Sequence, residues 1–380
     1  MKWRGTPAGR RRASRRDGGV PGILAALFLG AVVLLALSCS SAPPTSCDNE
    51  VLTAHPALLV LAPHPDDEAL GFTGLIDAYL RAGKPVTVVV VTDGDAYCEA
   101  CRFWKSSTVA GPTCSAEELS SFGEVRRTES TAAARILGLA PPRFLGYPDT
   151  GLAAAWQNLG DGKPTEPLRR SDFSGCTSCE PCSGYGKGPK TTLTSDTLMA
   201  SLRDIIAAAP NGTLIATTHW LDGHADHAAL GNFVRRLGGE HPVAYSVIHA
   251  HTPKNTAHSD CWYPTPAAPL CPCMNDEARA LADAGWIARL ESHRFRPTSP
   301  AALPDDADYG EEKQFCLPER LYLGDDAVKL KAVRSYASQL GRLGRNGSHP
   351  AALDGIIDCN GYMLSFVRRT EAFVLVEKRR

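Results

Sequence analysis

The chain alternates short apolar runs with segments of helical spacing, and this alternation constrains its fold more than any other feature. An apolar run of about four to eight residues bounded by turn residues is typical of a buried strand. Strands separated by helices predict a mostly parallel sheet with right-handed crossovers. We therefore expect an α/β fold of three layers, with a Rossmann-like, mostly parallel sheet. The expected strands are 57–62, 86–91, 143–146, 213–218, 243–248 and 372–376, and the expected helices start at 68 and cover 121–137, 195–208, 228–234 and 325–340.

The run His64-Pro65-Asp66-Asp67-Glu68 directly follows the first expected strand. It places one imidazole and two adjacent carboxylates at the carboxyl end of a strand, which is where ligands bind in open α/β sheets. Neighbouring carboxylates repel each other, and a divalent metal would remove that penalty. His64 and one aspartate would be ligands, and the other aspartate would take a proton from bound water. The alternative is an aspartate that only caps the following helix.

A second cluster of the same kind follows the strand expected at 213–218. It contains His224, Asp226 and His227 and leads into a helix. One of these histidines would complete a site of two histidines and one carboxylate with an open position for water, as catalytic zinc requires. The other would stabilise charge on a reacting carbonyl. Asp226 would orient an imidazole.

Several segments together make the chain similar to the PIG-L family of de-N-acetylases. The two specific segments are PHPDDEALG at 63–71 and HADH at 224–227. Weaker matches follow in the expected order: TDG at 92–94, Arg126 and Glu129 followed by ARILG, GYPDTG at 146–151, KLKAVRSYASQ at 329–339 and EAF at 371–373. The resemblance runs from about residue 55 to the C-terminus. The family includes deacetylases of N-acetylglucosaminyl-phosphatidylinositol and of mycothiol and bacillithiol synthesis.

The resemblance implies the metal ligands and the residues of the chemistry. It implies His64, Asp67 and His227 as zinc ligands. It implies Asp66 as the general base on zinc-bound water. His224, with Asp226 beside it, matches the histidine that stabilises the oxyanion or protonates the leaving amine.

Two further positions match residues that contact the sugar substrate, Arg126 and Asp149. For Arg126 the alternative is a solvated helix face, and for Asp149 it is a turn residue after Pro148. The expected activity is hydrolysis of a linear amide, the removal of acetyl from an N-acetylglucosaminyl-type amino-sugar. Zn²⁺ is the expected metal, with Fe²⁺ or another divalent ion as the alternative. A catalytically inactive sugar- or lipid-binding lipoprotein on the same fold is the alternative function.

The N-terminus resembles an export signal of the lipoprotein type. Residues 1–20 carry seven Lys/Arg, and residues 23–37 are all apolar or Gly. Such a basic region followed by a short apolar run is typical of a secretory signal. The following LSCSS segment resembles a lipobox, so we expect cleavage before Cys39 and attachment of a lipid to it. We expect a signal at 1–38, a tether at 39–50 and the deacetylase domain at 51–380, in a bacterial cell-envelope lipoprotein; a secreted or signal-anchored protein is the alternative.

The charge of the exported part argues against nucleic acid as a partner. Residues 1–38 hold seven of the 40 Lys/Arg and one of the 41 Asp/Glu, so the remainder carries a net charge of about −7. No basic stripe with interleaved aromatic residues is present, and nucleic-acid binding therefore has no electrostatic support. We expect a glycan or small-molecule substrate that carries an N-acetylated amino-sugar. We also expect the N-terminal lipid to attach the protein to a membrane.

The cysteines favour an oxidising compartment. Thirteen cysteines are present, which leaves twelve if Cys39 is lipidated. Disulfides are favoured in an exported protein. Structural zinc or an iron–sulfur cluster at the CxxC motifs, 98–101 and 176–182, is the alternative. The cysteines concentrate in three expected loop insertions, near 96–120, 153–192 and 252–320.

Overall fold

A seven-stranded sheet forms the centre of the computed structural model, which describes residues 47–106, 114–159, 193–249, 310–323, 326–340, 363, 366–367 and 369–377. All of these residues fall in the unit Ser46–Arg380. The strand order is β3-β2-β1-β4-β5-β7-β6. The expected α/β fold with a mostly parallel sheet is confirmed.

The first five strands are parallel, and the last two continue the sheet in antiparallel pairing. The parallel strands are β1 (Leu58–Ala62), β2 (Val86–Thr92), β3 (Arg143–Tyr147), β4 (Leu214–Thr218) and β5 (Val243–Ser246). The final strand β7 (Thr370–Val376) pairs antiparallel with β5 and with β6 (Glu311–Cys316). β6 was not predicted, because its sequence EEKQFC is largely charged, as suits a strand at the sheet edge.

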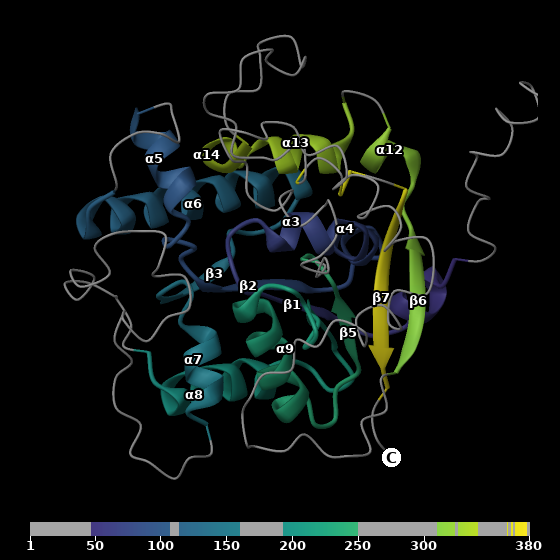
Figure 1. Ribbon diagram of the computed structural model, residues 1–380. Helices are drawn as coiled ribbons and strands as arrows, with labels where there is room; N and C mark the ends of the chain where they lie inside the picture. Colours follow the sequence, from purple (N-terminus) through teal and green to yellow (C-terminus); the bar gives the residue numbers. More distant parts are fainter. Residues whose placement is uncertain are drawn as a thin grey trace, which may run out of the picture. The chain divides into compact units, whose positions relative to one another are not determined.

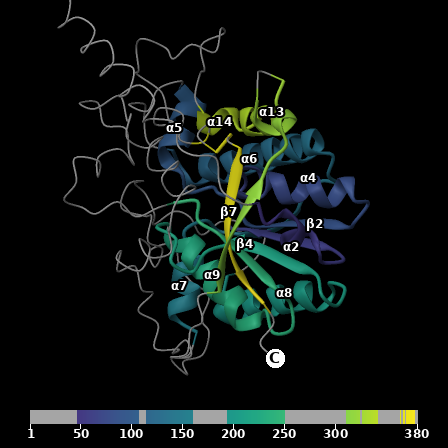
Figure 2. The same cartoon turned by 90° about the vertical axis from the view of Figure 1, so that its right-hand side faces the viewer.

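Helices cover both faces of the sheet, as the two views agree (Figures 1 and 2). One face carries α3 (Asp67–Gly71), α4 (Thr73–Arg81), α6 (Ala116–Leu137), α13 (Val328–Arg334) and α14 (Ala337–Leu340). The other face carries α7 (Leu152–Gln157), α8 (Ser195–Ala207) and α9 (Ala225–Leu237). The remaining described helices are α2 (Asn49–Thr53), α5 (Cys98–Ser106) and α12 (Glu319–Tyr322).

The central strand β1 shows why the expected strands are apolar throughout. Leu58 and Val60 join the core under α4 and α6, whereas Leu59 and Leu61 join the core over α8 and α9. Because side chains alternate between the two faces and both faces are covered, every position of the strand is buried.

Two helices differ from their predicted bounds. α6 begins five residues before the expected start because Ser115 forms a capping box with Glu118. The single helix expected at 325–340 is broken into α13 and α14. Tyr336 lies at the break, fully buried, and its hydroxyl donates to Glu68 Oε1 at 2.5 Å. The break therefore directs the Tyr336 hydroxyl towards Glu68, which follows β1 in the chain.

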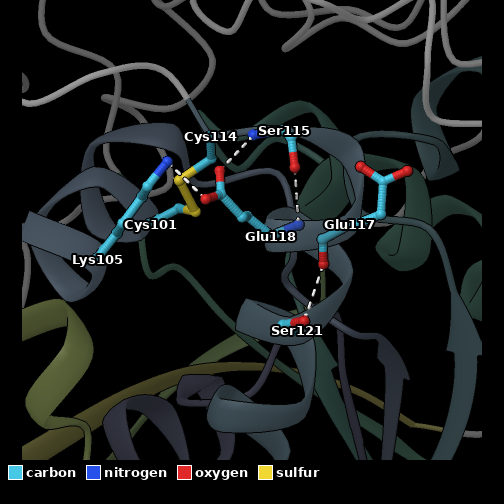
Figure 3. Close-up of a disulfide and its surroundings, with 7 residues drawn as sticks. All are labelled: Cys101, Lys105, Cys114, Ser115, Glu117, Glu118 and Ser121. Atoms are coloured by element: carbon cyan, nitrogen blue, oxygen red, sulfur yellow. Dashed lines mark hydrogen bonds and ion pairs between the residues drawn. A yellow bond between two sulfur atoms is a disulfide. The ribbon is translucent and has the colours of Figure 1, made fainter.

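Two disulfides lie within the described residues, and they confirm the preference for disulfides. Cys101 in α5 is bonded to Cys114, next to the cap of α6, where Lys105 also pairs with Glu118 (Figure 3). This pairing excludes Cys101 from a metal site of the CxxC type. Cys47 is bonded to Cys316 at the end of β6 and so ties the end of the expected tether to the sheet edge.

Several expectations lie outside the described residues. These are the signal and Cys39, most of the insertions at 153–192 and 252–320, and the cysteine cluster at 176–182. Among the helices that are described, none combines the length and the apolar character needed to cross a membrane.

We expect the two disulfides to differ in their contribution to stability, since constraining the unfolded chain stabilises more when the closed loop is longer. The Cys47–Cys316 bond closes a separation of 269 residues, and the Cys101–Cys114 bond one of 13. Replacing both cysteines of the longer loop by serine should lower the free energy of unfolding by about 5 kcal/mol, against about 3 kcal/mol for the shorter loop. Urea denaturation of the two double variants measures this, and a larger loss for the Cys101–Cys114 pair would contradict it.

Candidate metal centre

The candidate site lies where the strand order of the sheet reverses direction. From β1 the chain proceeds to β2 and β3 on one side, and from β4 it proceeds to β5 on the other. β1 and β4 are direct parallel neighbours, in register from Leu58–Leu214 to Leu61–Thr217. Their carboxyl ends therefore meet at one edge, and ligands bind at such a switch point.

Three side chains from the two predicted clusters converge there. The Nδ1 atom of His64 lies 3.1 Å from Nε2 of His227. The Oδ2 atom of Asp67 lies 3.4 Å from the same nitrogen of His64 and 3.3 Å from that of His227. The structure thus brings together the three atoms of the predicted ligand set.

The size of this triangle fits a metal ion. Zn–N and Zn–O bonds of about 2.1 Å in a tetrahedral site put ligand atoms about 3.4 Å apart. All three side chains are buried, and Asp67 is fixed because its Oδ2 accepts the backbone N–H of His64 at 2.9 Å. Two imidazoles and one carboxylate leave a fourth position for water.

Buried carboxylates around the triangle favour a positive charge within it. Burial alone would lower the pKa of His227, but Asp67 and Asp222 outweigh it and raise the pKa to about 9. Burial likewise opposes the charge of His64, yet Asp149 raises its pKa well above the usual value. Burial would raise the pKa of Asp67, but the two histidines hold it well below its usual range. The surroundings therefore stabilise positive charge.

Asp66 has the backbone of a strained turn and a carboxyl group with one strong partner. Its φ of 138° is in the region that side chains rarely adopt, and its N–H donates to Glu68 Oε2 at 3.0 Å. It occupies the N-cap position of α3, but its side chain makes no capping hydrogen bond. Instead its Oδ2 accepts from Arg126 Nη2 at 3.1 Å. Burial raises the pKa of Asp66 to about 7, although Arg126 opposes this.

Arg126 holds the loop that carries Asp66 in place through several hydrogen bonds. Its side chain is buried, so it does not lie on a solvated helix face. Besides Asp66 it donates to the carbonyl oxygens of Gly94 and Pro65, at 2.6 and 2.8 Å, and to Oε1 of Gln339, at 3.0 Å. Gly94 has a φ of +62°, and a Cβ there would lie 2.1 Å from the Arg126 guanidinium, so only glycine fits. The sugar contact predicted for Arg126 stays a prediction.

Asp149 and Asp226 lie on the far side of the His64 ring. Asp149 Oδ1 is 3.0 Å from His64 Nε2, and Asp226 Oδ2 is 3.6 Å from the same atom. These carboxylates favour a proton on Nε2, which leaves Nδ1 as the metal-binding nitrogen. Asp226 Oδ2 thus faces the His64 ring, and the orienting role predicted for Asp226 stays a prediction. The sugar contact predicted for Asp149 is untested by this geometry.

His224 caps the second site helix, α9. Its Nδ1 accepts the backbone N–H of Asp226 at 3.3 Å. In a neutral ring the proton must then be on Nε2, so His224 is fixed as a donor. Burial, together with the charges of His227 and His64, lowers the pKa of His224 to about 4. An atom of His224 lies within 4.8 Å of ligand atoms of His64 and His227.

Sequence reasoning missed three residues of this site. Glu68 is fully buried and accepts from Ser130 and Tyr336, both at 2.5 Å. Asp222 is fully buried beside His227. The ring of His249 lies 4.8 Å from that of His227. His249 follows β5, and its place at the carboxyl end of an expected strand was the signal that could have revealed it.

Comparison with known proteins agrees with the predicted resemblance. Residues 59–237 match the family model described as PIG-L, GlcNAc-PI de-N-acetylase. The chain is 29% identical over 178 residues to 1D-myo-inositol 2-acetamido-2-deoxy-alpha-D-glucopyranoside deacetylase of Nocardia farcinica, covering 46% of this chain and 49% of that protein. It is 35% identical over 115 residues to the protein of the same name from Mycobacterium avium, covering 30% and 34%. The chain thus spans about half or less of the length of these relatives.

Solved structures of deacetylases are also similar. The N,N'-diacetylchitobiose deacetylase of Pyrococcus horikoshii is 15% identical with a TM-score of 0.39, covering 95% of each chain. A triple mutant of a deacetylase of the teicoplanin biosynthetic pathway is 15% identical with a TM-score of 0.43, covering 84% of this chain and 98% of that one.

We expect Arg126→Ala to lower the free energy of unfolding by about 3–5 kcal/mol, because it leaves the buried Asp66 carboxylate without its cation. Arg127, the next residue of α6, is the matched control. It pairs with Asp93 at a partly exposed position, so Arg127→Ala should cost about 1 kcal/mol. Urea denaturation compares the two variants. Equal losses in the free energy of unfolding would show that Arg126 stabilises the fold no more than a partly exposed ion pair does.

Proposed function

Since residues 59–237 of this chain match the model of the PIG-L family of de-N-acetylases, we propose that the protein is a metal-dependent hydrolase that removes the acetyl group from an N-acetylated amino-sugar. The observation that carries the proposal is the triangle of His64 Nδ1, Asp67 Oδ2 and His227 Nε2, with edges of 3.1 to 3.4 Å. Its donor set is that of a catalytic zinc site.

The residues around the triangle divide the chemistry of amide hydrolysis between them. When bound by His64, Asp67 and His227, a divalent metal would lower the pKa of water and polarise the acetamide carbonyl. Asp66 is not one of these ligands and would accept the proton of the attacking water. Burial of the Asp66 carboxyl group raises its pKa towards the neutral range, which suits a group that both takes and returns a proton. Asp66 would then pass that proton to the leaving amine.

His224 would stabilise the carbonyl oxygen as it gains negative charge. Because its Nδ1 accepts from Asp226, its Nε2–H remains available as a donor. The low pKa of His224, about 4, favours the neutral donor over an imidazolium acid. We therefore assign His224 to the oxyanion, and Asp66 to both proton transfers. A donor of this kind contributes about 2.7–4 kcal/mol to lowering a barrier.

The proposed substrate class is an N-acetylglucosaminyl compound. The support is the name of the matching family and of the curated relatives, which act on an acetamido-glucopyranoside. Acetate release from a panel of N-acetylglucosaminyl compounds, with and without chelator, tests the proposal. Release that stops with chelator and returns with Zn²⁺ would support it, whereas release from no compound would contradict the amino-sugar assignment. Adding Fe²⁺ instead of Zn²⁺ to the chelated protein, and comparing the acetate release that each metal restores, would test zinc as the proposed metal.

The alternative of an inactive sugar- or lipid-binding protein finds no support in the site. A protein that only binds has no need of a carboxylate beside the complete ligand set. Asp66 is nevertheless present there, in a strained turn held by Glu68 and Arg126.

We expect Asp66→Asn to lower kcat by about 100- to 10,000-fold, because an amide cannot accept the proton of water. Zinc content should stay unchanged, since Asp66 is not part of the ligand triangle. Asp48→Asn is the matched control, because Asp48 accepts the backbone N–H of Gln314 in the edge strand β6. Acetate release and metal analysis of both variants measure this. Full activity of Asp66→Asn would rule out Asp66 as the base.

We also propose that residues 1–38 are an export signal and that Cys39 carries a lipid that holds the protein at the cell envelope. The LSCSS segment supports this, as do the two disulfides, which form and persist in oxidising compartments. Residues 39–50 would be the tether, with Cys47 near its end bonded to Cys316 of the folded domain.

We expect Cys39→Ala to move the protein from the membrane fraction to the soluble fraction of a bacterial host that processes lipoproteins, because one cysteine carries the anchor. Ser46→Ala is the control, since Ser46 lies in the expected tether and has no thiol to carry a lipid. Immunoblots of separated fractions measure the change. Equal membrane association of Cys39→Ala and the unchanged chain would contradict the lipid anchor.

A further inference from the structure

A buried aspartate that the sequence motifs do not include lies behind one of the proposed metal ligands. Asp222 follows β4, two residues before His224, and is fully buried. Its Oδ1 lies 3.5 Å from Nδ1 of His227, the ring nitrogen opposite to the one in the ligand triangle. We propose that Asp222 is the positioning residue that holds His227 in the orientation and tautomer needed to bind the metal. This inference rests on the proposed metal site.

The carboxylate of Asp222 is fixed by three backbone donors. Its Oδ1 accepts from His224 N at 2.9 Å. Its Oδ2 accepts from Ile248 N at 2.8 Å and from His249 N at 3.1 Å. These donors come from the loop after β4 and the loop after β5. Asp222 therefore joins two loops at the carboxyl edge of the sheet and cannot rotate away from His227 without breaking their hydrogen bonds.

The position of Asp222 selects between the two tautomers of His227. A negative oxygen beside Nδ1 favours a proton on that nitrogen and leaves the Nε2 lone pair free for a metal. Within the described part of the chain, Nδ1 of His227 is buried and makes no hydrogen bond, and Asp222 Oδ1 lies 3.5 Å from it. The Asp222 carboxylate is thus the group that can receive the Nδ1 proton.

The two ligand histidines are supported in mirrored ways. His64 presents Nδ1 to the triangle and has Asp149 at Nε2, 3.0 Å away. His227 presents Nε2 to the triangle and has Asp222 at Nδ1. Each imidazole therefore lies between the ligand triangle and a buried carboxylate. This arrangement fixes which nitrogen of each ring is available.

The change Asp222→Asn tests the inference, because it keeps the size of the side chain and removes its charge. With its oxygen kept on Ile248 N and His249 N, the new amide would direct N–H groups towards His227 Nδ1. That would favour the tautomer with a proton on Nε2 and block the metal. We expect the Kd for Zn²⁺, measured by competition with a chromogenic chelator, to rise by about 10- to 100-fold.

Three measurements keep the test independent of a loss of folding. Circular dichroism and the Kd of the control Asp48→Asn show whether a lost backbone acceptor alone weakens metal binding. On the unchanged protein loaded with ¹¹³Cd²⁺, ¹⁵N NMR of the histidines should show coupling of the metal to a His227 Nε2 and a proton on its Nδ1.

The outcomes separate this inference from the proposed function. An unchanged Kd in a folded Asp222→Asn variant, or metal coupled to Nδ1 of His227, would overturn the role of Asp222 while leaving the metal site in place. Failure of the unchanged protein to bind Zn²⁺ at all would overturn both. A raised Kd in Asp222→Asn with no change in Asp48→Asn, together with a proton on Nδ1, would support the inference.

Discussion

The parallel pairing of β1 with β4 is the constraint on which the site depends. The two strands are separated by about 150 residues of sequence but lie side by side, from Leu58–Leu214 to Leu61–Thr217. Each strand is buried on both faces, so burial of apolar side chains stabilises the pair. Because they run parallel, the loops that follow them emerge at the same edge. A shift in this register would separate His64 from His227 whatever the local sequence of their loops.

Concentrating charge at this edge costs stability, and the network around the site limits that cost. Asp66, Asp67 and Glu68 are all buried, and an unpaired buried carboxylate is strongly unfavourable. Each therefore has a specific partner: Arg126 for Asp66, the two ligand histidines for Asp67, and two hydroxyls for Glu68. A cation bound in the triangle would offset the remaining negative charge. The strained backbone at Asp66 also lowers stability, and strain of this kind is common at functional sites.

Support for the site comes from elements that are far apart in the chain. Arg126 extends from α6, Tyr336 and Gln339 come from the broken helix after β6, and Asp149 follows β3. The hydrogen bonds of Arg126, Tyr336 and Gln339 fix the segment after β1 from the face that α6 and α13 cover, and Asp149 contacts His64. Asp222 fixes the loop after β4, because its carboxylate accepts hydrogen bonds from the backbone of that loop and of the loop after β5. The predicted ligand set thus lies in two short motifs, whereas the orientation of its side chains depends on contacts from distant elements.

The sequence alone determined the fold class, most of the strands and the two motifs whose His64, Asp67 and His227 converge in the structure. It could do so because burial leaves an apolar run for each strand, and because His-Pro-Asp-Asp-Glu and His-Ala-Asp-His each follow such a run directly. The sequence did not reveal β6, whose charged pattern suits an exposed edge, or the break at Tyr336. Nor could it show that Arg126 is buried and hydrogen-bonded to the segment after β1, or that Asp149 lies beside His64 and Asp222 beside His227. Those roles arise from contacts between distant elements, and no local pattern records which buried carboxylate will face which ring nitrogen.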